Sequence, residues 1–210
     1  NVSLDSLQPD VFGHVTRRGR LEDVIQGIDA ARKEGIAVKI NMVVLRGIND
    51  GEIGDMLRWC DARGMDLTLI ETMPLGEVAE DRTDHYMPLH EAIAPLRDDY
   101  DLLPIDYKTG GPARYFGVSG MRARLGLITP MSHNFCDGCN RMRITCQGRI
   151  YMCLGHEDHI DLKTAFREGG PAALDALLDQ ALLAKPLRHE FAIGRGKAPA
   201  TVRHMSVTGG

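Results

Sequence analysis

The first third of the chain alternates between short apolar runs and segments with helical spacing of apolar residues. This alternation restricts the possible folds more than any other feature. Strands are predicted at residues 36–45 and 67–71, and helices at 21–35 and 49–64, after a strand-like start at residues 2–4. Strands and helices that alternate in this way form parallel βα units. The sequence therefore predicts an α/β fold, either a doubly wound sheet or a (β/α) barrel.

Two polar side chains interrupt the predicted strand at 36–45. Strands of a parallel sheet are covered on both faces and usually consist of apolar residues, but Lys39 and Asn41 lie on one side of this strand. A buried ammonium group needs a partner or a ligand. Lys39 is therefore a candidate ligand-binding residue, and the alternative is a lysine at a frayed sheet edge.

The pattern changes after a loop of proline, glycine and acidic residues at 73–88. A short helix is expected at 89–96, and residues 161–185 are helical in character. Between them lie strand-like pieces and glycine-rich turns, with strands predicted at 102–107, 115–118 and 125–128. We expect a domain boundary near residue 98, which gives two domains, 1–98 and 99–210.

Composition excludes several classes of function. The 210 residues are 43% hydrophobic and 26% charged, which is typical of globular proteins, and no apolar run could span a membrane. The net charge of −4 predicts no general attraction to nucleic acid. The five cysteines are too unevenly spaced for a disulfide framework, and no secretory signal opens the sequence. We expect a reducing, cytoplasmic environment.

Four of the five cysteines crowd into residues 136–153. Cys136 and Cys139 form a C-x2-C pair, whose spacing directs two thiolates at one metal site. The following sequence predicts a hairpin that returns Cys153 to the side of this pair. Three thiolates leave two alternatives. One is zinc with His156 as the fourth ligand, and the other is a [4Fe–4S] cluster with one iron open to another ligand.

Two arginines follow the C-x2-C pair directly. Arg141 and Arg143 are two residues apart on the first arm of the hairpin, so both guanidinium groups are expected on one face. Such planar groups suit phosphate or carboxylate ligands, and a solvated basic edge is the alternative. Cys146 lies on the arm opposite Cys153, and we expect it to be a free cysteine rather than a ligand.

Several short motifs resemble, in chain order, the C-terminal two thirds of the GTP 3′,8-cyclases. This family, also known as molybdenum-cofactor biosynthesis protein A, belongs to the radical S-adenosylmethionine superfamily. The matching segments are Asn-Val-Ser-Leu-Asp (1–5), Val-Lys-Ile-Asn (38–41), Ile-Glu-Thr-Met-Pro (70–74), Gly-Pro-Ala-Arg-Tyr-Phe (111–116), Phe-Cys-x-x-Cys-Asn-Arg-x-Arg (135–143), Cys-Leu (153–154) and the terminal Gly-Gly. Together they span the whole chain.

The resemblance implies a fold and a reaction. Residues 1–98 would be the C-terminal part of an incomplete (β/α) TIM-like barrel of the radical SAM type. Residues 99–210 would be an α+β cysteine-containing domain that binds a cluster and GTP. The implied activity is that of a lyase, the radical cyclisation of GTP to (8S)-3′,8-cyclo-7,8-dihydroguanosine 5′-triphosphate. This is the first step of molybdopterin (molybdenum cofactor) biosynthesis.

The resemblance also assigns roles residue by residue. It implies that a [4Fe–4S] cluster, whose open iron meets guanine, is held by Cys136, Cys139 and Cys153. The residues implied to bind GTP are Lys39, Arg141 and Arg143, and those implied to bind S-adenosylmethionine are Ser3 and Met73. The tail of Gly209 and Gly210 would reach into the active site. No nucleophile is implied.

Two features depart from the family pattern. The first cluster motif, CxxxCxxC, does not occur in these 210 residues. We expect it upstream of Asn1, together with a second [4Fe–4S] cluster, and we expect the 210 residues alone to be inactive. The second departure is Thr68, where many relatives carry an arginine. The implied partners are a reductant, the downstream cyclic pyranopterin monophosphate synthase and a second copy in a homodimer, with no nucleic acid and no membrane.

Three other functions fit parts of the sequence. A structural zinc-binding module on an α/β scaffold would use Cys136, Cys139, Cys153 and His156, and it would bind no nucleotide. A sulfur-carrier protein also ends in Gly-Gly, but such proteins are small single domains without βα units. A different radical enzyme with an auxiliary cluster, such as one that acts on peptides, would not depend on GTP.

Overall fold

The computed structural model describes residues 1–77 and 81–208. It contains two compact units, one formed by residues 1–72 and 84–134 and the other by residues 73–83 and 135–210. Each unit has its own sheet and its own apolar cluster, so each is described separately.

The first unit is built on a six-stranded mixed sheet with the order β1-β2-β3-β6-β5-β4. Strands β1, β2, β3 and β6 are parallel neighbours, whereas β5 is antiparallel to both β6 and β4. The strands are β1 (Val2–Ser3), β2 (Lys39–Val44), β3 (Asp66–Glu71), β4 (Leu102–Ile105), β5 (Arg114–Val118) and β6 (Arg124–Ile128). The predicted α/β class and the predicted strands are confirmed.

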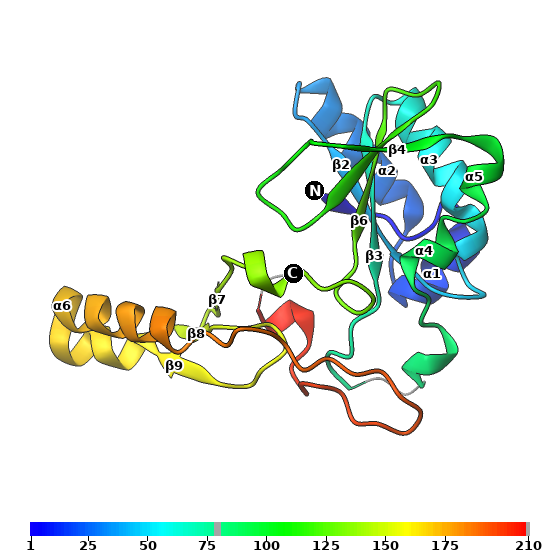
Figure 1. Cartoon of the computed structure of the whole chain (residues 1–210). Coiled ribbons are helices and arrows are strands. Elements are labelled where there is room, and N and C mark those ends of the chain that lie inside the picture. Colours follow the sequence, from blue (N-terminus) through cyan, green and yellow to red (C-terminus); the bar gives the residue numbers. More distant parts are fainter. Residues whose placement is uncertain (78–80, 209–210) are drawn as a thin grey trace. The chain divides into compact units, whose positions relative to one another are not determined.

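The helices of this unit lie against one face of the sheet (Figure 1). Apart from η2 (Arg82–Asp84), which extends across the division between the units, they are α1 (Pro9–Thr16), α2 (Leu21–Lys33), η1 (Asp50–Glu52), α3 (Ile53–Ala62), α4 (Leu89–Ala92) and α5 (Leu96–Asp99). On β2, Ile40, Met42 and Val44 are fully buried against them. The alternate residues of the same strand are only half-buried. The sheet therefore has one apolar face and one polar face, which is the arrangement that Lys39 and Asn41 indicate.

Two helical details differ from the sequence-based expectation. Helix α1 was not predicted, although Pro9 at its first turn is a typical start signal and Phe12 is buried. The single helix expected at 89–96 is two short helices, α4 and α5, joined by a turn at residues 93–95 with Pro95 directly before the second. Proline cannot donate the backbone hydrogen bond that a continuous helix needs at this position.

The second unit has a three-stranded antiparallel sheet, β7 (Arg143–Ile144), β8 (Arg149–Tyr151) and β9 (His159–Asp161). The predicted hairpin is β7–β8, with Gly148 at a φ of 77° in its turn. Helix α6 (Leu162–Leu183) covers this sheet with apolar residues from both of its ends, and it is broken at Gly170 and Pro171. Short helices η3 (Cys136–Gly138) and η4 (Met205–Val207) complete the unit.

The boundary expected near residue 98 falls within the first unit, inside helix α5. Strands β4, β5 and β6 extend the same sheet as β1, β2 and β3. The division of the family into functional domains at this residue stays a prediction. No helix in the described residues combines the length and the apolar character needed to cross a bilayer.

Candidate functional site

Local structure brings the three predicted cysteine ligands together within the second unit. Cys136 begins η3, and the backbone N–H of Cys139 donates to the carbonyl of Cys136 at 3.0 Å, which closes a tight turn. The β7–β8 hairpin then returns the chain, so that Cys153 lies two residues after β8. All three thiols are half-buried, and Cys153 interacts electrostatically with both of the others.

The three thiols are the candidate donor set of this unit. Across residues 1–77 and 81–208, no three His, Cys, Asp or Glu side chains converge closely enough to hold one metal ion. His156 does not complete a zinc site, because its Nε2 lies 3.2 Å from the carbonyl oxygen of Arg188. Three thiols are a ligand type that iron–sulfur clusters take.

The surroundings of two of these thiols affect their ionisation in opposite directions. Burial opposes ionisation of Cys139, but the backbone N–H and guanidinium of Arg141, with the charge of Lys185, lower its pKa below the usual value. Burial raises the pKa of Cys153, against the backbone N–H of Gly155 and the charge of Lys185. Thiolates are the form that binds metal, so the cations favour the ligating form of both thiols.

Arg141 and Arg143 form a cationic cluster beside the cysteines. Nη2 of Arg141 lies 4.0 Å from Sγ of Cys139, and its guanidinium lies 5.1 Å from the centre of the Phe135 ring. Burial lowers the pKa of Arg143, and the charges of Arg141 and Arg203 add to this effect. Like charges held together at partial burial are stabilised when an anion binds between or beside them.

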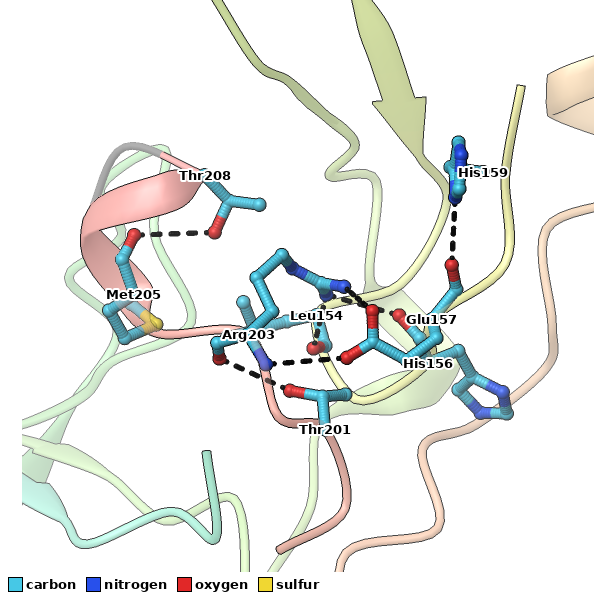
Figure 2. Close-up of polar contacts among 8 residues, drawn as sticks. All are labelled: Leu154, His156, Glu157, His159, Thr201, Arg203, Met205 and Thr208. Atoms are coloured by element: carbon cyan, nitrogen blue, oxygen red, sulfur yellow. Dashed lines mark hydrogen bonds and ion pairs between the residues drawn. The ribbon is translucent and has the colours of Figure 1, made fainter. Parts of the chain in front are cut away.

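Arg203 joins the C-terminal segment to the loop that follows Cys153 (Figure 2). Its side chain is only 5% exposed and forms an ion pair with Glu157, with 2.7 Å between Nη1 and Oε2. Nη2 donates to the carbonyl oxygens of Leu154 at 3.1 Å and His156 at 3.0 Å. The guanidinium also lies 3.9 Å from the centre of the Tyr151 ring. This arginine therefore fixes the loop beside the third cysteine.

In the first unit, one row of residues crosses the polar face of the sheet. Strand register aligns, in order, Ser3, Asn41, Thr68, Gly126 and Tyr115. Oδ1 of Asn41 and Oγ1 of Thr68 are buried and make no hydrogen bond within the described part of the chain. A Cβ atom on Gly126 would lie 2.9 Å from the Tyr115 ring and 3.0 Å from the Thr68 hydroxyl. Glycine is required here because the tyrosine ring occupies that space.

Lys39 lies beside this row and is bound to a tyrosine rather than to a carboxylate. Its Nζ donates to the hydroxyl of Tyr115 at 3.0 Å. Its register neighbour, Asp66, is instead paired with Arg124 at 3.0 Å. No carboxylate forms an ion pair with Lys39 in the described residues. The ammonium group is therefore placed to receive an anionic ligand.

The other predicted residues have separate locations. Ser3 and Lys39 belong to the first unit, whereas Met73 belongs to the second unit with Arg141 and Arg143. Gly209 and Gly210 lie outside the described residues. The remaining cysteines differ from the three candidate ligands. Cys146 is exposed, and Cys60 is fully buried in the apolar core, where burial raises its pKa to about 12.

Sequence reasoning did not single out Tyr115, Lys185 or Arg203. Tyr115 lies within a motif shared with the family, which was a usable signal. Lys185 and Arg203 act on backbone carbonyls of segments far away in the sequence. A solitary lysine after a helix and an arginine in a basic tail carry no local pattern that distinguishes them from surface residues.

Comparison with known proteins shows the class of protein to which this chain belongs. Residues 1–60 match the Radical SAM superfamily, and residues 65–191 match the family described as Molybdenum Cofactor Synthesis C. The chain belongs to this molybdenum cofactor synthesis family within the radical SAM proteins.

Curated relatives that match this chain carry a more specific name. The chain is 56% identical over 212 residues to the GTP 3′,8-cyclases of Rhizobium etli and Sinorhizobium medicae, and 53% identical to that of Brucella canis. These matches cover 100% of this chain but only 61% of the first two relatives and 62% of the third. The resemblance to GTP 3′,8-cyclases is confirmed, and the chain spans about three fifths of their length.

Proposed function

We propose that this chain is part of a GTP 3′,8-cyclase that converts GTP to (8S)-3′,8-cyclo-7,8-dihydroguanosine 5′-triphosphate, the first step of molybdenum cofactor biosynthesis. The observation that carries the proposal is that three thiols and two arginines, Arg141 and Arg143, lie together in one unit of a radical SAM family member. The curated relatives are named for this reaction.

In this proposal, the iron–sulfur clusters and S-adenosylmethionine supply the radical chemistry when bound. Cys136, Cys139 and Cys153 hold the C-terminal [4Fe–4S] cluster. Arg141 and Arg143 neutralise and orient the triphosphate, since guanidinium groups bind phosphate oxygens in pairs. Each such charge-assisted hydrogen bond contributes about 1.5–3 kcal/mol. Orientation by the protein selects which substrate hydrogen is closest to the radical.

The remaining assignments belong to the same proposal. Residues 1–98, with strands β1, β2 and β3, form the C-terminal part of the incomplete barrel. Lys39 binds GTP on the polar face of that sheet, and Ser3 and Met73 bind S-adenosylmethionine. A second [4Fe–4S] cluster belongs to the portion of the relatives that this chain does not cover. The expected partners are a reductant, the next enzyme of the pathway and a second copy of the chain.

Anaerobic reconstitution with iron and sulfide tests the proposal. We expect a brown protein with about four irons per chain, whose absorption spectrum shifts when GTP is added. A colourless protein that binds one zinc ion and is indifferent to GTP would overturn it in favour of a structural zinc module. A cluster-containing protein that is indifferent to GTP would point to a radical enzyme with another substrate.

Lys39→Ala should weaken GTP binding by about tenfold, which corresponds to about 1.4 kcal/mol. The effect is at the low end for a charged contact because the ammonium group is half-buried and gives up its Tyr115 bond on binding phosphate. Isothermal titration with GTP measures the change. Lys33→Ala, at an exposed lysine of α2, is the matched control. Equal affinity of the two variants would return Lys39 to a structural role.

A further inference from the structure

Lys185 joins the two arms that carry the cysteine ligands. It follows the end of α6 and is half-buried. Its Nζ donates to the carbonyl oxygen of Arg141 at 2.9 Å and to that of Met152 at 2.7 Å. Arg141 is two residues after Cys139, and Met152 directly precedes Cys153. One ammonium group therefore connects the segment after the C-x2-C turn to the segment of the third cysteine.

The ammonium group of Lys185 also places a positive charge near the sulfur atoms of the cysteines. Lys185 interacts electrostatically with both Cys139 and Cys153. In the described residues it forms no ion pair with a carboxylate. An ammonium group has three N–H donors, and the two carbonyls use two of them. Its charge is therefore not neutralised by the protein around the thiols.

The nearby arginines Arg141 and Arg203 have different contacts from those of Lys185. Arg141 lies 4.0 Å from Sγ of Cys139, on the arm of the C-x2-C turn. Arg203 is paired with Glu157, and it holds carbonyls on the far side of Cys153, those of Leu154 and His156. Among the described contacts, Lys185 is the cation that bridges both arms.

We propose that Lys185 is a positioning residue for the cluster held by Cys136, Cys139 and Cys153. This inference rests on the proposed function. Lys185 fixes the separation between Cys139 and Cys153 through the two carbonyls, and its charge offsets the negative charge of the thiolate ligands. Without it, both carbonyls lose a donor and the arms are free to separate, so the cluster is released more readily.

The test compares variants of this chain after anaerobic reconstitution with iron and sulfide. Lys185→Met removes the charge and the donors at similar length, Lys185→Arg keeps the charge, and Lys33→Met is the control at an exposed lysine. The measurement is the rate at which a ferrous chelator removes iron. We expect release about tenfold faster for Lys185→Met, as for loss of other groups that orient metal ligands. Lys185→Arg should be intermediate, and the control should match the unmodified chain.

Circular dichroism of the metal-free proteins verifies that the helices are retained. Should Lys185→Met lose its helical signal, Lys185→Gln, which keeps an amide donor without the charge, takes its place. If the unmodified chain holds the cluster and both uncharged variants release iron at its rate, the inference is overturned and the proposed function stands. If the unmodified chain binds no iron–sulfur cluster, both are overturned.

Discussion

Replacing Cys153 by alanine should abolish the C-terminal cluster, reducing the iron content after reconstitution from about four per chain to background. The physical reason is the small number of ligands. The proposed cluster has three protein ligands, and the described part of the chain offers no further cysteine beside them except the exposed Cys146. Neither His156, whose Nε2 lies against a backbone carbonyl, nor an exposed Cys146 can replace it.

The matched control is Cys146→Ala, on the same hairpin. It removes a thiol of equal size but should leave the iron and sulfide content unchanged, because Cys146 is exposed in the turn between β7 and β8, at the end of the hairpin away from Cys153. Iron and acid-labile sulfide analysis measures both variants. Full retention of the cluster in Cys153→Ala, or its loss in Cys146→Ala, would show that the third ligand is wrongly assigned.

Replacing Arg141 and Arg143 together by alanine should weaken GTP binding by about a hundredfold or more. Two charge-assisted contacts of about 1.5 kcal/mol each, at the low end of the range, combine to about 3 kcal/mol. Burial lowers the pKa of Arg143, and repulsion from the charges of Arg141 and Arg203 lowers it further. A triphosphate relieves this repulsion, so its affinity depends on both groups.

Arg149→Ala provides the control, since Arg149 is an exposed arginine on β8 of the same hairpin. Its affinity for GTP should equal that of the unmodified chain. The double variant should retain the iron content of the unmodified chain, which separates a substrate role from a ligand role. GTP affinity that survives in the double variant would assign the two arginines to a solvated edge instead.

Local patterns in the sequence were sufficient for most of the secondary structure. Apolar runs at 39–44 and 66–71 and the helix at 53–62 follow from side-chain periodicity. The β7–β8 hairpin follows from Gly148, whose φ of 77° suits glycine best. The same reasoning missed α1, and it did not predict that β4–β6 would continue the sheet of β1–β3. Pairing between strands far apart in the chain leaves no periodic signal in either one.

For the candidate site, the sequence by itself predicted the residues and their chemistry. Residue types and short spacings were enough to predict the C-x2-C pair, the returning Cys153 and the two arginines. A turn and a hairpin place these residues locally in the chain. Tertiary structure decided what surrounds them. Tyr115 reaches Lys39 across 76 residues, and Lys185 reaches the Arg141 carbonyl across 44. Any tyrosine or lysine could make such bonds, so only the path of the folded chain selects these two.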